Sequence, residues 1–297
     1  MRIGLATAVT TALFLAACGG GSGNGPEDAA GGHGGVMASG PGEPPGTGGG
    51  DVPVVALPGP VDAVLGQLPA GFSVSYDRAT DTVTIDDGTG PVLLGNAVPS
   101  PRLFQRYNTR GPSAIWFEYA ETASGSGAAS FFVNSRAGVA GTMFSRLSET
   151  RLPDSGTAEF SGQYTAVLVG SDARPASRIA ADATLMADFA AGSVSGEITN
   201  RRAELGPSTR LILGPAGISD GAFTGTATGG ELISGSTISS GTTTMTGSYA
   251  GLFTGANGAE VVGGVAIPHI AEGAAVQLWG DQPLTEIGAF LAERTGP

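Results

Sequence analysis

The sequence contains no lysine, and all of its 14 basic residues are arginine. This absence excludes every mechanism that needs a lysine amine, including the P-loop, Schiff-base chemistry and Ser-Lys dyads. The only two histidines, His33 and His269, leave little room for general-base catalysis or a multi-histidine metal site. Because 26 acidic residues give a net charge of −12, nucleic acid is not expected as a partner. The composition favours a binding or structural protein, with no catalytic residue and no metal site.

Charged residues are also few, at 13% of the chain, whereas there are 51 glycines and 19 prolines in 297 residues. A chain of this length is too large for one compact domain, and its charge content is too low for disorder throughout. We therefore expect one or two folded domains joined to unfolded sequence.

The sequence has a single cysteine, Cys18. It ends an apolar run that follows Arg2 and is too short to span a bilayer, as in a secretion signal. The run closes on Leu-Ala-Ala-Cys, which resembles the bacterial lipobox, so residues 1–17 are predicted to be a signal peptide and Cys18 to be acylated. Two or three acyl chains anchor a protein stably. Gly19 stands where an aspartate would signal inner-membrane retention, which favours the outer membrane. The alternative is an ordinary signal peptide with a cysteine of no assigned use.

Residues 19–50 have no aromatic side chain and contain 15 glycines. Such a stretch cannot offset its ordering entropy by burial, so residues 18–51 are predicted to be a lipidated, flexible tether. Its average reach is roughly 30 Å. His33 lies within this segment, and we interpret it as a solvated linker residue.

Beyond residue 52 the chain consists of short strand-like runs separated by Gly, Ser, Asp and Pro, which predicts an all-β fold. Residues 72–86 have the pattern of a hairpin, with a turn from Asp77 to Asp81. The aspartates there, together with Asp86 and Asp87, lack the spacing of a calcium loop, so turn chemistry is the favoured explanation.

Three later segments alternate with a period of two, as half-buried antiparallel strands do. In each, the apolar set is expected to face inward and the polar set outward; the inward sets are Phe160, Gly162, Tyr164, Ala166 and Leu168, then Ala183, Leu185, Ala187 and Phe189, then Val194, Gly196 and Ile198. A polar outward face is unlike the lipid-facing band of a membrane barrel.

Glycine stands two residues before an aromatic ring at Gly162, Gly221 and Gly247. On one strand face, this spacing lets strands bend and rings pack over bare backbone in a small closed barrel. We therefore predict an antiparallel barrel of about eight strands from residue 156 to the end. Segments such as 234–242 are its expected turns.

Three of these segments, in order, resemble the β-barrel domain of the transferrin-binding protein B family. Residues 156–164 look like its entry strand. Residues 247–264 carry Gly-x-Tyr-x-Gly-x-Phe, a short turn with Gly and Asn, and Glu-Val-x-Gly-Gly. Residues 287–294 are similar to its closing strand, Gly-Ala-Phe-x-Ala followed by a basic residue. The resemblance covers 156–297 well and covers 52–155 only loosely, as a small antiparallel strand-rich handle domain.

The resemblance implies a non-catalytic surface lipoprotein of a Gram-negative outer membrane, expected to be a monomer. Such proteins capture a soluble protein or haem ligand, often for a TonB-dependent receptor, with iron or haem only as cargo and no cofactor. The full transferrin receptor component has two handle-barrel lobes, whereas this chain has room for one and is closer in size to the single-lobe relatives of the family. The alternatives are a structural or adhesive lipoprotein, or an immune-evasion module like factor H-binding proteins.

Residues 102–151 hold six arginines against three glutamates, whereas residues 156–297 hold six arginines against 13 acids. This polarity would steer an acidic partner to the handle. Arginine with aromatic residues is common at binding hot spots, so the candidate ligand-binding residues are Arg102, Arg106, Arg110 and Trp116. The alternative is that Trp116, Tyr119, Phe131 and Phe132 are core residues and the arginines a solvated face.

Two further hypotheses concern His269, the only histidine in a region that is expected to fold. The first is a hydrolase with His269 as its base. Such an enzyme would need a nucleophile beside that base, yet the sequence has no Gly-x-Ser-x-Gly elbow. His269 precedes a predicted loop, where it would be placed to ligate haem, but a structural role is the favoured reading.

Overall fold

The computed structural model of the 297-residue chain is built almost entirely of β-strands. It describes residues 61–67, 73–77, 79–86, 91–95, 103–108, 115–133, 139–147, 150–170, 175–203, 206–207, 210–229, 245–270 and 283–296. Cys18, His33 and the predicted turn 234–242 lie outside these ranges. The one helix in the described ranges is a single 3-10 turn, η1 (Ala256–Gly258), and no helix there is long and apolar enough to cross a bilayer. The all-β prediction is confirmed.

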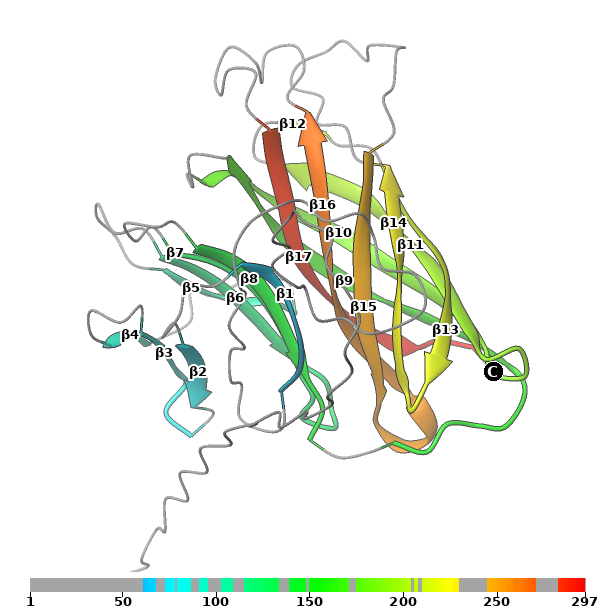
Figure 1. Cartoon of the computed structure of the whole chain (residues 1–297). Helices are drawn as coiled ribbons and strands as arrows, with labels where there is room; N and C mark the ends of the chain where they lie inside the picture. The colour runs from blue at the N-terminus through cyan, green and yellow to red at the C-terminus, as the bar shows by residue number, and fades with distance from the viewer. Residues whose placement is uncertain are drawn as a thin grey trace, which may run out of the picture. The chain divides into compact units, whose positions relative to one another are not determined.

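The first part of the chain forms two antiparallel sheets. The five-stranded sheet has the order β1-β8-β7-β6-β5. Its strands are β1 (Val61–Gln67), β5 (Gln105–Asn108), β6 (Ile115–Glu121), β7 (Gly127–Val133) and β8 (Val139–Ser145). The three-stranded sheet consists of β2 (Ser73–Asp77), β3 (Thr82–Asp86) and β4 (Pro91–Gly95), in that order. Figure 1 shows both sheets in blue to green.

The predicted hairpin at 72–86 is formed by β2 and β3, which pair antiparallel. In the turn between them, the Asp77 carboxylate accepts hydrogen bonds from the Ala79 amide and the Thr80 hydroxyl. Asp81 has a φ of 50°, a left-handed conformation that aspartate tolerates better than most residues. Its carboxylate accepts hydrogen bonds from the hydroxyl groups of Tyr76 and Tyr107. Hydrogen bonds within the protein thus account for both turn aspartates.

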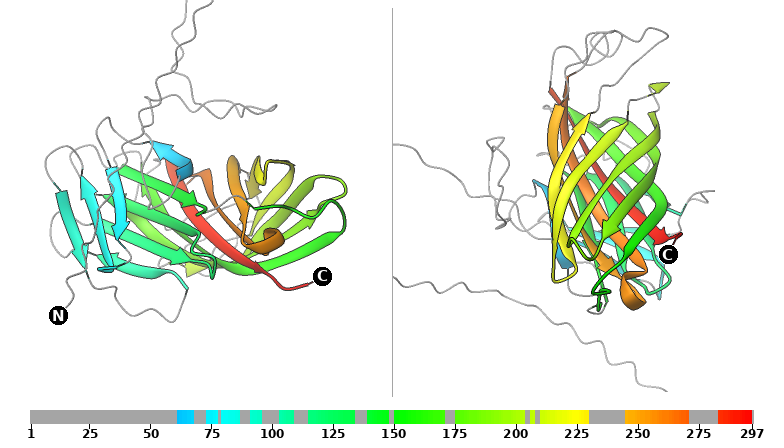
Figure 2. Two further views of the ribbon diagram at one scale, coloured as in Figure 1. Left: turned by 90° about the horizontal axis from the view of Figure 1, so that it is seen from below. Right: turned by 90° about the vertical axis from the view of Figure 1, so that its right-hand side faces the viewer.

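The second part of the chain forms a closed antiparallel barrel of eight strands, in agreement with the prediction. The strands follow the order β10-β9-β17-β16-β15-β14-β13-β11, and pairing of β10 with β11 closes the ring, as Figure 2 shows. The two-residue strand β12 (Gly206–Pro207) extends β11. The barrel strands are β9 (Thr157–Gly170), β10 (Pro175–Asp188), β11 (Ser193–Ala203), β13 (Leu211–Ser219), β14 (Ala222–Gly229), β15 (Met245–Thr254), β16 (Glu260–Ile270) and β17 (Pro283–Arg294).

The barrel interior is filled by apolar side chains. Phe160, Leu168, Leu185 and Ile198 are all fully buried in it, and the polar residues Glu159, Ser161 and Asp182 are exposed. The predicted alternation on β9 to β11 is confirmed. A barrel of eight strands is just wide enough for side chains to fill, so its centre is a packed core.

Aromatic rings cover glycines, as the spacing predicted, and the rings lie over glycines of the neighbouring strand. The Tyr249 ring covers its register partner Gly225, and the Phe223 ring covers its partner Gly251. Phe290 lies over Gly263 in the same way. The bare backbone of each glycine gives the ring its space, and the ring shields the strand hydrogen bonds there.

The five-stranded sheet is covered on both faces, and every residue of β7 and β8 is therefore buried. Phe117 and Phe131 on one face pack against Val83 and other residues of the three-stranded sheet. On the other face, Phe132 packs against Val167 of the barrel wall. Both sides of these strands are thus apolar, as in sheets buried between two layers.

The outward face of the barrel is not polar all round. Leu252, Val262 and Leu291 point outward on β15, β16 and β17, yet they are buried against Phe144 of the five-stranded sheet and Phe104, which directly precedes β5. The expectation of a polar outer face holds for β11, for the first half of β9 and, apart from the exposed Met186, for β10. It fails where the sheet packs against the barrel.

Candidate functional site

A cleft of about 110 Å³ lies between β5 and β6 of the five-stranded sheet and β9 to β11 of the barrel. The segment before β5 is tied to the barrel wall because the Leu103 amide donates a hydrogen bond to the Gln163 side-chain oxygen, at 2.8 Å. The cleft therefore draws residues from two sheets that are far apart in sequence. Its lining residues are Phe104, Arg106, Glu118, Gln163, Tyr164, Thr165, Arg178, Ile179, Ala180 and Arg202.

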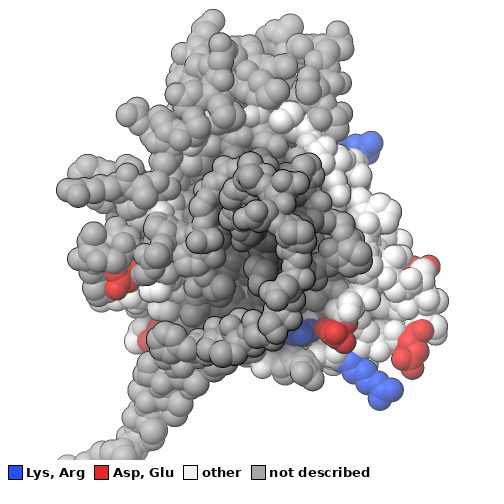
Figure 3. Space-filling model, viewed as in Figure 1, with Lys and Arg blue, Asp and Glu red and all other residues white. Residues whose placement is uncertain are grey.

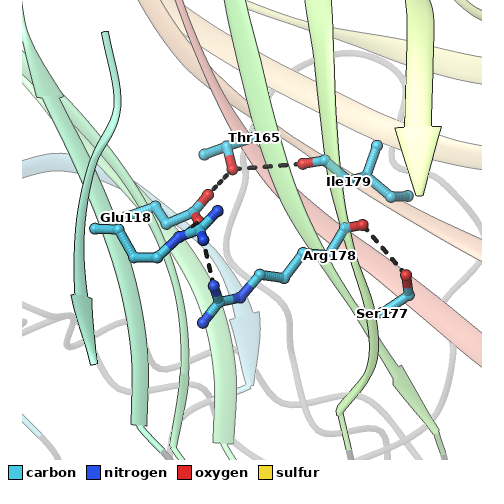
Figure 4. Close-up of polar contacts among 6 residues, drawn as sticks. Glu118, Thr165, Ser177, Arg178 and Ile179 are labelled. Carbon is cyan, nitrogen blue, oxygen red and sulfur yellow. Dashed lines mark hydrogen bonds and ion pairs between the residues drawn. The ribbon is translucent and has the colours of Figure 1, made fainter. Parts of the chain in front are cut away.

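Glu118 lies at the centre of the polar contacts in this cleft (Figure 4). The Arg106 guanidinium donates from Nε to Glu118 Oε1 at 2.9 Å, from the neighbouring strand β5. The Thr165 hydroxyl of β9 donates to Glu118 Oε2, and the side chain of Glu118 is only 12% exposed. The carboxylate thus joins the five-stranded sheet to the barrel wall through charge-assisted hydrogen bonds.

Arg178 enters the cleft from β10. Its Cζ atom lies 4.1 Å from the centroid of the Trp116 ring, within the range of a cation–π interaction. Its Nη1 atom is 3.9 Å from Glu118 Oε1, and its side chain is 12% exposed. The ring and the barrel wall therefore hold the guanidinium in a defined place while part of it faces the cleft.

Positive charge exceeds negative charge in the cleft. Its lining includes three arginines, Arg106, Arg178 and Arg202, and one carboxylate, Glu118. The nearby Asp182 is not in the lining and accepts a hydrogen bond from the Asn200 amide at 2.7 Å. On the face seen in Figure 3, by comparison, the charged side chains of described residues are of both signs and form no extended blue patch. The cleft is thus a local concentration of cationic groups in an acidic chain.

Of the residues predicted for ligand binding, the structure brings Arg106 and Trp116 to the same cluster, on either side of Glu118 and Arg178. Arg102 and Arg110 lie outside the described residues. The rings of Tyr119, Phe131 and Phe132 are buried and belong to the core, which was the alternative interpretation. A ligand-binding role for Arg106 and Trp116 stays a prediction.

Sequence reasoning missed Arg178 and Arg202, because both were counted within an acidic barrel. The strand pattern carries only part of the signal, the placement of Arg178 on the outer face of the barrel. Arg178 is in the outward phase of β10, which Ala180 and Asp182 share, and Ala180 is the register partner of Arg202. Which outward positions of the barrel meet the first sheet depends on the packing of one on the other, and alternation does not reveal it.

His269 belongs to a second polar cluster, inside the barrel. Its Nε2 atom is 2.8 Å from Glu286 Oε2, and the Tyr164 hydroxyl donates to Glu286 Oε1 at 2.8 Å. The Arg201 guanidinium also donates to Glu286 Oε2, and all four residues are buried. Because His269 is buried and paired with Glu286, its position supports a structural role over the role of a haem ligand. Among the described residues, no group of three or more His, Cys, Asp and Glu side chains is placed to hold a metal ion.

A wider groove of about 490 Å³ lies at the barrel end that holds the β10–β11 turn. Leu152, from the segment between β8 and β9, packs there against the barrel core. The groove includes Arg151 but also Asp154 and Asp220. It therefore lacks the positive excess of the first cleft and is less suited to an acidic partner.

No protein-family model and no curated protein matches this sequence. Among solved structures, the chain is similar to transferrin-binding protein B from serogroup B Neisseria meningitidis, with 16% identity and a TM-score of 0.43, over 74% of this chain and 40% of that chain. It is also similar to a mutant of transferrin-binding protein B from Haemophilus parasuis, with 13% identity and a TM-score of 0.44, over 72% of this chain and 40% of that one. The chain thus matches less than half the length of these proteins.

Proposed function

We propose that this chain is a non-catalytic, lipid-anchored protein of the outer-membrane surface that captures a soluble protein ligand through the cleft at Arg106, Glu118 and Arg178. The observation that carries the proposal is the lining of that cleft, in which three arginines outnumber one carboxylate. Arginine beside tryptophan is typical of binding hot spots. An acidic surface on the ligand would complement this charge.

The cleft favours a protein side chain over haem as the group that is bound there. Sites that bury a drug-sized ligand have volumes of roughly 300–1,000 Å³, whereas this cleft has about 110 Å³. In the proposal, residues 18–51 form the tether, residues 52–155 the handle domain and residues 156–297 the barrel domain. Transfer of cargo to a TonB-dependent receptor is a further part of the same proposal.

The anchor is tested by Cys18→Ser. We expect the variant to lose incorporation of labelled fatty acid completely and to move from the membrane fraction to the soluble fraction, because two or three acyl chains are needed for stable attachment. Metabolic labelling and membrane fractionation measure both effects. Persistent labelling of the variant, or an unlabelled wild type, would contradict lipidation at Cys18.

Ligand capture is tested with the full acylated chain in detergent, immobilised and exposed to soluble extracellular proteins at low salt. We expect the double variant Arg106→Gln/Arg202→Gln to reduce the captured ligand at least about tenfold, since it removes two charges from the cleft. Raising the salt concentration to 0.5 M should weaken capture by the wild type through screening. Quantitative mass spectrometry of the retained proteins gives the measurement.

The matched control is Arg151→Gln/Arg210→Gln, which removes the same charge from two exposed positions outside the cleft. This control should capture ligand as the wild type does. If the wild type retains no protein at low salt, or if both double variants retain it equally, the proposed function is wrong.

A further inference from the structure

The cleft at Arg106, Glu118 and Arg178 has the dimensions and charge of a receptor for one small anionic group. The cleft has a volume of about 110 Å³, and a single water needs roughly 10–15 Å³ of such space. There is room for a carboxylate group with a few waters. A porphyrin or a folded peptide segment would not fit.

Arg178 is prepared for anion binding before any ligand arrives. Its guanidinium Cζ atom lies 4.1 Å from the centroid of the Trp116 ring, and its side chain is only 12% exposed. An arginine that is already immobilised loses little conformational entropy when it binds. Its planar donors match the two oxygens of a carboxylate.

Arg202 adds a second donor from the barrel. It is exposed on β11, opposite Ala180 of β10 in the strand register, and Ala180 is two residues from Arg178 in sequence. Both arginines line the same cleft. A group that enters the cleft would thus meet cationic side chains from two adjacent barrel strands.

Glu118 is the internal competitor for these donors. Its Oε1 atom is 2.9 Å from Arg106 Nε but 3.9 Å from Arg178 Nη1. The carboxylate is therefore held chiefly by Arg106 and by the Thr165 hydroxyl. It also lies beside the Arg178 guanidinium, where its negative charge repels any second anion that approaches.

We infer that the cleft binds one carboxylate group between Arg178 and Arg202, and that Glu118 competes with it and lowers its affinity. The inference rests on the proposed function and gives the chemistry of the ligand group: an aspartate or glutamate side chain of the captured protein. Free small carboxylates share that chemistry and bind more weakly, since they lack the surrounding contacts.

The test uses the fluorescence of Trp116, which lies under the guanidinium of Arg178. Trp279→Phe leaves Trp116 as the only tryptophan of the full chain. Titration with acetate at constant ionic strength should change the emission saturably, with half-saturation in the millimolar range. N-acetyl-triglutamate amide should saturate at lower concentration than acetate, and N-acetyl-triglutamine amide should have no effect.

Three variants of the Trp279→Phe protein separate the roles of Arg178, Arg202 and Glu118. Arg178→Gln should raise the half-saturating concentration at least about tenfold, and Arg202→Gln, at an exposed position, should raise it several-fold. Glu118→Gln should lower it about threefold or more, because the amide keeps hydrogen bonds but removes the competing charge. Arg210→Gln, an exposed arginine with a side chain 68% accessible, is the control and should change nothing.

A response that is linear in acetate, or one that Arg178→Gln and Arg202→Gln leave unchanged, overturns the inference. Weaker binding in Glu118→Gln overturns the competitor role. Protein capture that persists without any response to acetate or the acidic peptide refutes the carboxylate cleft and leaves capture standing. Saturable acetate binding without captured protein refutes capture and leaves the cleft standing.

Discussion

Glu286→Ala should lower the free energy of unfolding by about 3–5 kcal/mol, the usual cost of removing one partner of a buried ion pair. The substitution leaves the buried Arg201 guanidinium without the carboxylate that it contacts. It also removes the acceptor of the Tyr164 hydroxyl and the partner of His269. The total free energy of unfolding of a native domain is only about 5–15 kcal/mol. The melting temperature should therefore fall by about 10 °C. Urea unfolding and calorimetry measure the effect.

The matched control is Glu293→Ala, an exposed glutamate on the same strand. Its effect should stay within about 0.5 kcal/mol. The double variant Arg201→Met/Glu286→Leu should recover much of the loss, because an apolar pair avoids the burial of charge. If Glu286→Ala costs no more than Glu293→Ala, the cluster does not stabilise the barrel.

The same carboxylate gives stability a pH dependence. Burial acts to raise the pKa of Glu286, but the charge of Arg201 and the contacts with His269 and Tyr164 outweigh burial and lower it to about 2 from 4.5. A folded pKa below the unfolded one contributes stability above the unfolded pKa that is lost as pH falls. The full contribution is about 3 kcal/mol, of which about 2 kcal/mol is gone by pH 3. Urea unfolding at pH 7 and pH 3 should show a smaller difference in Glu286→Gln than in the wild type.

Gly162→Ala should cost about 3 kcal/mol or more, at the upper end of overpacking effects. A Cβ atom at Gly162 would overlap the carbonyl oxygen of Leu291 and lie 2.5 Å from the Cα atom of Ala292. Both neighbours are backbone atoms of β17, so no side-chain rotation relieves the overlap. The strand would have to move away from β9, which disrupts one of the pairings that close the barrel.

Gly217→Ala is the control on another barrel strand, because nothing lies within 4 Å of a Cβ there. It should change the unfolding free energy by less than about 0.5 kcal/mol or stabilise slightly. Hydrogen exchange of the β9 and β17 amides would locate the disrupted pairing. We expect faster exchange in Gly162→Ala and unchanged exchange in Gly217→Ala. Equal stability of the two variants would mean that β9 and β17 are not so closely paired.

The barrel and the inward faces of its early strands followed from local patterns. Alternation at Phe160, Leu168 and Leu185 predicted which side chains fill the barrel, because the period of a strand fixes its two faces. Glycines spaced two residues from aromatic residues predicted strand bending and rings packed over bare backbone. The spacing did not say which glycine each ring covers: rings such as Tyr249 cover glycines of the adjacent strand, since register decides which residues are opposite.

The candidate site was less accessible to sequence reasoning. Arg106 and Trp116 were found because they are near each other in a stretch rich in arginine. Arg178 and Arg202 come from strands 60 or more residues later in the chain, and nothing local marks them as neighbours of Glu118. Likewise the burial of Leu252 and Val262 on the outside of the barrel reflects coverage by another sheet.

The sequence by itself determined the all-β class, the closed barrel of about eight strands, the hairpin at residues 72–86 and the inward faces of the early barrel strands. These properties depend on side-chain period and turn chemistry, which act over a few residues. Only the tertiary structure decided which face of the barrel the five-stranded sheet covers, and hence that Arg178 meets Trp116 and Glu118. Contacts between distant strands depend on how two surfaces pack, and that information is spread over the whole chain.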